Sequence, residues 1–270
     1  MSQKEKHMKK TIFAAAVLCA ALQTAYAQRI VVMSPDVADI VVALGATNEI
    51  VARDQTVQNP ILKSKPSIGI HRQLTVEPII AAKPDVAIGS WMVQPATIFA
   101  NLKKAGVNAV NVAPDDSIAA YPQSIRAVGK LINKTAQADA LAGKWQADMK
   151  QQPQNGKRYL FSYDGRIVAG KNTAADEIIK RAGGINAAAN LDGMKPLNRE
   201  AWIAAKPDVI IIADHHEKLI GGVKQFAARP EIAGSNAAKN GKIYLWKAND
   251  MFRYGLDTPQ VVKKLNGLAK

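Results

Sequence analysis

A ten-residue segment occurs twice in this chain, and this repeat constrains the fold more than any other feature of the sequence. Residues 77–86 and 200–209 are identical at eight of ten positions and are separated by a constant 123 residues. Each copy predicts a short helix with an acid in its first turn, a stop at Lys-Pro-Asp, and then a buried strand. A looser echo relates residues 30–45 to residues 167–183 as strand, turn and helix. A single unit of this kind is common in α/β proteins and is weak evidence alone. Two matches in the same order predict two lobes of similar topology.

The remaining pattern predicts an α/β protein with a mostly parallel sheet in each lobe, because short β-rich runs alternate with helical segments. We expect an N-terminal lobe over residues 28–132 and a C-terminal lobe over residues 154–270. Residues 133–153 predict one long connecting helix, with Trp145 and Met149 on its apolar stripe. In such a molecule a ligand is expected in the cleft, at the carboxyl ends of the strands of both sheets.

Residues 1–27 have the features of a secretory signal. Lysines precede an apolar run over residues 12–22, and Ala25-Tyr26-Ala27 ends it with small residues. The run is about half of the roughly 20 residues that span a bilayer, so we expect cleavage after Ala27, a periplasmic location and a soluble mature protein. The sole cysteine, Cys19, lies in this segment. The residues before Cys19 match poorly the pattern of a lipid-modified cysteine, although that interpretation stays open. If Cys19 is removed with the signal, the mature chain contains no cysteine, which excludes disulfides, zinc-thiolate sites and cysteine nucleophiles.

The chain is strongly basic. Residues 1–27 contain four lysines and one glutamate, so the mature chain carries +11 of the total net charge of +14. A basic surface attracts nucleic acid, an anionic membrane face or a ligand with carboxylates. The lysines and arginines are scattered and few aromatic residues lie between them, which argues against a nucleic-acid partner. We expect a monomer.

Four short segments carry a signature that is more specific than the repeat. Three are in the expected C-terminal lobe, at residues 169–176, 182–187 and 195–201, and one is Gly-Ile-His-Arg-Gln-Leu at residues 69–74. Together they resemble the periplasmic binding proteins that feed ABC importers of haem, cobalamin and ferric siderophores, and the haem-binding members most of all. The resemblance covers nearly the whole mature chain. It implies two α/β lobes joined by one long helix, haem as the transported ligand, and an ABC permease as partner.

The chain departs from this family at the iron ligand. The family's usual tyrosine in the segment Gly-Tyr-x-Arg-x-Leu is Ile70 here, and Asp257 stands where the family commonly has an arginine. One position beyond Ile70, His71 offers an imidazole, which is a sound haem ligand. The shift of 123 residues carries His71 onto Met194, which makes this thioether a candidate second ligand, and Tyr254 is the competing candidate.

Further residues are expected around the ligand. Arg72, Lys195 and Arg253 could pair with the propionates of haem, because a guanidinium fits a carboxylate bidentately. Trp91 and Met92 follow a predicted core strand and could cover a flat apolar ligand. Basic surface and core packing are the plain alternatives for these two groups.

Two acids at equivalent positions of the repeat are expected to contact the permease. Glu77 and Glu200 begin the two repeated helices, and the family docks through one acidic residue from each lobe. Helix capping alone is the plain alternative. The pair His215 and His216 beside Asp214 is expected to be a surface loop, with a zinc site as the weaker alternative.

Enzymatic motifs are missing from the sequence. It contains no Gly-x-Ser-x-Gly elbow, no phosphate loop and no His-Glu-x-x-His helix. We therefore expect a haem-binding importer component rather than an enzyme. A binder of another iron or corrin ligand is the first alternative, and an exported hydrolase is the last.

Overall fold

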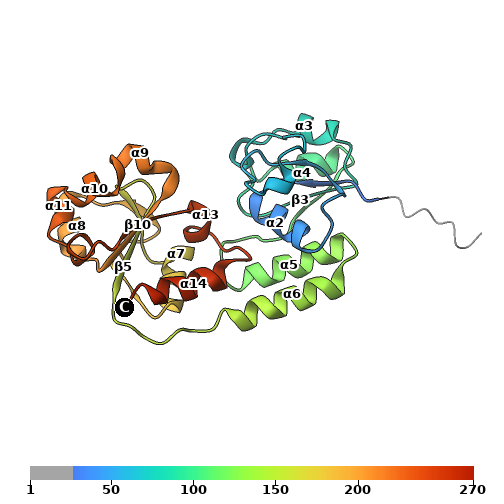
Figure 1. Cartoon of the computed structure of the whole chain (residues 1–270). Coiled ribbons are helices and arrows are strands. Elements are labelled where there is room, and N and C mark those ends of the chain that lie inside the picture. Colours follow the sequence, from blue (N-terminus) through green and yellow to red (C-terminus); the bar gives the residue numbers. More distant parts are fainter. Residues whose placement is uncertain (1–26) are drawn as a thin grey trace, which may run out of the picture.

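The computed structural model describes residues 27–270 and shows two α/β lobes side by side (Figure 1). The predicted secretory signal, except for its last residue, lies outside the described residues. Within residues 27–270, no helix is both long and apolar enough to cross a membrane.

The N-terminal lobe has one fully parallel sheet of four strands. In sheet order the strands are β2 (Ile50–Arg53), β1 (Ile30–Val32), β3 (Val86–Gly89) and β4 (Asn108–Asn111). The helices of this lobe are α2 (Pro35–Ala43), α3 (Val76–Ala81), α4 (Ile98–Lys104) and α5 (Ala120–Leu131), with 3₁₀ turns η1 (Pro60–Leu62) and η2 (His71–Gln73).

The C-terminal lobe has a mixed sheet of six strands. Its main path is β10 (Ile243–Trp246), β9 (Val209–Ala213), β5 (Arg158–Ser162), β6 (Ile167–Ala169) and β8 (Met194–Pro196), and β7 (Ile185–Asn186) pairs with β5. The first three strands are parallel, whereas β6 runs antiparallel to both β5 and β8. The helical segments are α7 (Ala174–Arg181), α8 (Arg199–Ala205), η3 (Asp214–His216), α9 (Glu217–Ile220), α10 (Gly222–Ala227), α11 (Pro230–Ala233), α12 (Asn236–Lys239), α13 (Ala248–Met251) and α14 (Thr258–Gly267).

The structure confirms the repeat of residues 77–86 and 200–209, and the two copies share individual hydrogen bonds. Helices α3 and α8 each lead through Lys-Pro-Asp into a central parallel strand, β3 or β9. The lysine of each stop, Lys83 or Lys206, adopts a left-handed conformation with φ of 48° or 44°. The aspartate of each stop accepts a hydrogen bond of 2.8 Å from the backbone N–H of Arg29, which precedes β1, or of Arg158, which begins β5. The two lobes therefore share a helix–stop–strand unit.

The looser match between residues 30–45 and 167–183 is only partly confirmed. Helices α2 and α7 do follow strands in both lobes, but β1 is a central parallel strand and β6 is antiparallel to its neighbour. The counterpart of β1 is β5, because β5 pairs in parallel with β9 as β1 pairs with β3.

The connecting helix α6 (Thr135–Asp148) packs against α5, and irregular chain from residue 149 leads to β5 (Figure 1). Its Trp145 is buried, with its ring 5.0 Å from that of Tyr121 and 6.4 Å from that of Tyr254. The indole Nε1 donates to the carbonyl of Gly255 over 2.9 Å. One continuous apolar core thus extends from the N-terminal lobe through α6 into the C-terminal lobe.

Candidate ligand-binding site

A cavity of about 360 Å³ lies between the lobes. Its walls follow the carboxyl ends of β1, β2 and β3 in one lobe and of β5, β9 and β10 in the other, as the cleft rule predicts. The lining residues are Pro35, Thr56, Gln58, Ile70, His71, Arg72, Trp91 and Met92 on one side, and Tyr163, Asp214, His215, Ala248, Asn249, Phe252 and Arg253 on the other. The size falls in the range of about 300–1,000 Å³ that is usual for small-molecule sites.

His71 lies on the N-terminal wall and is only 5% exposed. The loop before it turns at Gly69, whose φ of 98° suits glycine. The imidazole Nδ1 lies 3.1 Å from the hydroxyl of Thr56 and 3.3 Å from a carboxylate oxygen of Asp54. Among the described residues, the other nitrogen, Nε2, is buried without a hydrogen-bond partner. A buried nitrogen left unpaired is costly and needs a partner such as a water, an ion or a ligand. Within residues 27–270, Nε2 of His216 and Nε of Arg253, both in the C-terminal lobe, share this property.

Three side chains that were expected near the ligand line the same wall of the cavity as His71. Arg72 follows His71 and is exposed, and Trp91 and Met92 follow β3 after Ser90 and are half-buried. The Trp91 backbone N–H donates to the carbonyl of Ala113 over 2.7 Å, which fixes this segment against the chain after β4. The N-terminal wall therefore combines an imidazole, a guanidinium and two large apolar side chains.

The opposite wall is an aromatic cluster around Tyr163, which the sequence did not single out. The Tyr163 ring lies 5.3 Å from that of His215, 4.7 Å from that of His216 and 5.8 Å from that of Phe252, measured between centroids. His215 is held near Asp214, with Nδ1 3.8 Å from a carboxylate oxygen. The expected surface loop therefore places His215 in the same cavity as His71, whereas His216 does not line it. Burial, and then the charge of His215, lower the pKa of His216.

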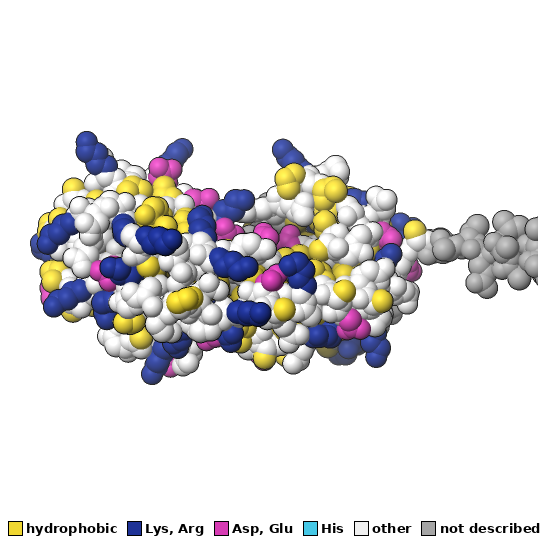
Figure 2. Space-filling view, turned by 60° about the horizontal axis from the view of Figure 1, so that its bottom comes forward, with side chains coloured by type: hydrophobic (Ala, Val, Ile, Leu, Met, Phe, Trp, Pro, Cys, Tyr) yellow, Lys and Arg dark blue, Asp and Glu magenta, His cyan; other side chains and the backbone are white. Residues whose placement is uncertain are grey.

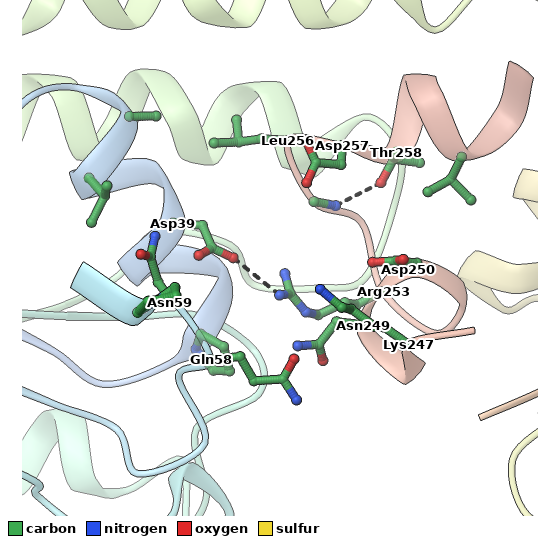
Figure 3. A pocket seen from close by; sticks show the side chains of 16 residues that line it. Asp39, Gln58, Asn59, Lys247, Asn249, Asp250, Arg253, Leu256, Asp257 and Thr258 are labelled. Atoms are coloured by element: carbon green, nitrogen blue, oxygen red, sulfur yellow. Dashed lines mark hydrogen bonds and ion pairs between the residues drawn. The ribbon is translucent and has the colours of Figure 1, made fainter. Parts of the chain in front are cut away.

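Arg253 connects the two lobes. Its guanidinium lies 3.3 Å from a carboxylate oxygen of Asp39 on α2, and the two side chains point toward one another in Figure 3. Burial raises the pKa of Asp39, and the charge of Arg253 partly offsets this effect. Arg253 also lines a neighbouring cavity of about 400 Å³. A ligand carboxylate that pairs with Arg253 must therefore compete with Asp39.

Three other residues predicted for the site lie elsewhere. Met194 and Lys195 are on β8, the outer strand of the sheet, and neither lines a cavity described for residues 27–270. Tyr254 is buried in the shared core against Trp145. Burial raises the pKa of Tyr254 well above its usual value, and this disfavours the phenolate that would bind iron.

The two predicted docking acids occupy equivalent places. Glu77 and Glu200 are exposed in the first turns of α3 and α8. Asn198 caps α8 by accepting from the backbone N–H of Ala201, whereas the Thr75 side chain makes no such bond to the backbone of α3. A hydrogen bond from its own backbone and one from Thr75 lower the pKa of Glu77. Both carboxylates are therefore available at the surface.

Comparison with known proteins agrees with this architecture. Residues 30–249 match the periplasmic binding protein family, and the chain belongs to this family. It is similar to the periplasmic heme-binding protein RhuT from Roseiflexus sp. RS-1, with 30% identity, a TM-score of 0.82, and coverage of 90% of this chain and 100% of that one. The periplasmic heme-binding protein HutB of Vibrio cholerae has 26% identity and a TM-score of 0.79, with 89% and 98% covered.

A curated relative is named as a protein of the same class. The uncharacterized ABC transporter substrate-binding lipoprotein YvrC of Bacillus subtilis (strain 168) is 25% identical over 259 residues, which cover 90% of this chain and 79% of the relative. The chain is thus a substrate-binding protein of the ABC transporter type, as the sequence predicts, and its relatives are transport proteins rather than enzymes.

Proposed function

We propose that this protein captures haem in the cavity between its lobes and delivers it to an ABC permease. The observation that carries the proposal is the buried, unpaired Nε2 of His71 in a cavity with aromatic walls. A neutral imidazole nitrogen is a common haem ligand. The solved relatives named above are described as heme-binding proteins, which supports the same ligand class.

The cavity walls also offer contacts for the macrocycle and the carboxylates of haem. Trp91 and Phe252 offer apolar faces for a flat macrocycle, and Arg72 and Arg253 offer guanidinium groups for its carboxylates. His215 and Tyr163 are the favoured candidates for a second iron ligand, because they line the same cavity as His71. Met194 and Tyr254, the candidates taken from the sequence, do not line it.

The ligand class is tested by titration of the purified protein. We expect hemin to bind saturably with a shifted Soret band, and cobalamin or a ferric siderophore to bind more weakly and to be displaced by hemin. Saturable binding of cobalamin or a ferric siderophore in preference to hemin would show that the cavity serves a different iron or corrin ligand.

Delivery to the permease is proposed to use the repeated surface of α3 and α8. One helical turn after each acid, an isoleucine is exposed: Ile80 is 39% exposed after Glu77, and Ile203 is 55% exposed after Glu200. An apolar side chain beside a carboxylate, once on each lobe, suits a partner that presents two similar basic and apolar surfaces. The face shown in Figure 2 has its lysines and arginines spread over both lobes rather than gathered in one strip, which argues against nucleic acid as the partner.

The place of action is proposed to be the periplasm, reached through cleavage after Ala27. The membership in the periplasmic binding protein family and the apolar run of residues 12–22 support this proposal. The protein is expected to act as a monomer that docks on a membrane protein.

A further inference from the structure

A chain of hydrogen bonds lies behind His71 on the side away from Nε2. Nδ1 of His71 lies 3.1 Å from Oγ1 of Thr56, and this hydroxyl in turn bonds to Oδ1 of Asp54. Oδ2 of Asp54 lies 3.3 Å from the same Nδ1. Asp54 is fully buried and follows β2, seventeen residues before His71.

The proton positions in this chain follow from the acceptor at its end. A carboxylate only accepts hydrogen bonds, so the single proton of the Thr56 hydroxyl goes to Asp54. The Thr56 oxygen can then only accept from the imidazole, which requires the proton of a neutral His71 to sit on Nδ1. The lone pair is left on Nε2, the ring nitrogen of His71 that has no hydrogen-bond partner in the described part of the chain.

We propose that Asp54 and Thr56 are positioning residues that fix the tautomer and the ring orientation of His71, so that Nε2 is presented as a ligand for the metal of the bound compound. The inference rests on the proposed function. Carboxylates behind metal-binding histidines orient the ring and raise the basicity of the metal-bound nitrogen. Here the chain supplies one such carboxylate directly and a hydroxyl that links the same carboxylate to the imidazole.

Asp54 also has a structural role that the test must separate. Its carboxylate accepts the backbone N–H of His71 and, over 2.8 Å, that of Thr56, so it holds the loop as well as the ring. Asp54→Asn removes the charge but keeps only one acceptor oxygen, so it also removes one of these two bonds, which end on different oxygens of Asp54. Thr56→Val removes only the hydroxyl, and Thr56→Ser restores it. The exposed Thr97, which makes no capping bond, provides the matched control Thr97→Val.

The experiment is hemin titration of the full chain combined with the visible spectrum and the reduction potential of the bound iron. We expect Asp54→Asn and Thr56→Val to weaken hemin binding by roughly 10- to 100-fold and to raise the reduction potential, because a less basic imidazole stabilises ferric iron less. Thr56→Ser and Thr97→Val should behave like the unmodified protein. In a His71→Ala background, Asp54→Asn should have no further effect on the spectrum or the potential.

The outcomes separate this inference from the proposed function. An unchanged spectrum and affinity in His71→Ala would overturn His71 as the ligand, and the inference with it. A loss in His71→Ala with no change in Thr56→Val or Asp54→Asn would overturn the positioning role alone. An equal effect of Asp54→Asn with and without His71 would also overturn it, because Asp54 would then act independently of the imidazole. If Asp54→Asn does not fold, the pair Thr56→Val and Thr56→Ser decides the question.

Discussion

The half-buried Asp116 carboxyl group is expected to make the stability of the fold depend on pH. Burial, and then the negative charge of Asp36, raise the pKa of Asp116 to about 7, against the opposing charge of Arg253. A carboxyl whose pKa is higher in the folded state than in the unfolded chain favours folding most when it is protonated. Its contribution is complete below pH 4 or so and is lost as the pH rises through about 7.

We therefore expect Asp116→Asn to remove the loss of stability that accompanies ionisation of this carboxyl group as the pH rises. The free energy of unfolding, measured in urea, should be higher in the variant than in the unmodified protein at pH 8, and the difference should shrink at pH 5. A difference of the same size at both pH values would contradict the account, because a neutral amide can gain over the carboxyl only where the carboxyl is ionised.

Individual site residues could be predicted where the sequence carried a local signal. His71, Arg72, Trp91 and Met92 were expected at the cleft, and all four line the cavity. His215 had an equally good signal, because it follows a strand whose carboxyl end faces the cleft.

Other site residues had weaker signals or none. The acids beside His215 favoured an interpretation as surface loop. Asp54 and Thr56 could not be predicted, since their role depends on the placement of β2 beside a loop seventeen residues away.

Among the elements, α6 connects the core of one lobe to the other through Trp145. Its indole is buried between Tyr121 and Tyr254 and donates to the carbonyl of Gly255. We expect Trp145→Ala to lower the free energy of unfolding by about 3–5 kcal/mol. Trp145→Phe keeps most of the apolar contact and should cost about 1 kcal/mol for the lost hydrogen bond. Chemical denaturation measures both, and a loss below about 1 kcal/mol in Trp145→Ala would show that the shared core does not depend on this residue.

The helix starts of α3 and α8 give the docking prediction. Replacing both Glu77 and Glu200 by Ala should abolish haem delivery in a reconstituted transport assay and leave hemin binding unchanged, because both side chains are exposed away from the cavity. Glu217→Ala is the matched control, since Glu217 is an exposed acid in the first turn of α9 without a counterpart in the repeat. Full delivery by the double variant would refute the docking role.

The repeat also shows where an extrapolation from sequence fails. The equivalence of the lobes holds from helix to strand, but before α3 the chain forms the turn η2, whereas before α8 it forms the edge strand β8. The shift of 123 residues therefore carried His71 onto a strand rather than onto a second cleft loop. An edge strand can accommodate Pro196 because one side of it forms no ladder. In the sequence, the same proline argued against a strand, so β8 was not predicted.

At the scale of the whole molecule, the shared core limits the relative motion of the lobes. The apolar cluster runs without interruption through α5, α6 and the C-terminal lobe, and Arg253 pairs with Asp39 across the cleft. We expect ligand entry to need small adjustments rather than wide closure. Small-angle scattering with and without hemin should give nearly equal radii of gyration, and a large decrease on binding would contradict this view.

The most direct test of the central claim is the Soret spectrum of the protein during hemin titration, recorded for the unmodified chain, His71→Ala and Thr97→Val. Thr97 is exposed and does not line the cavity, so Thr97→Val serves as the surface control. The account predicts that His71→Ala shifts or bleaches the Soret band and weakens binding by at least about 10-fold, as expected for loss of an iron ligand, while Thr97→Val keeps the spectrum of the unmodified protein. An unmodified spectrum and affinity in His71→Ala would contradict the claim that this imidazole binds the iron.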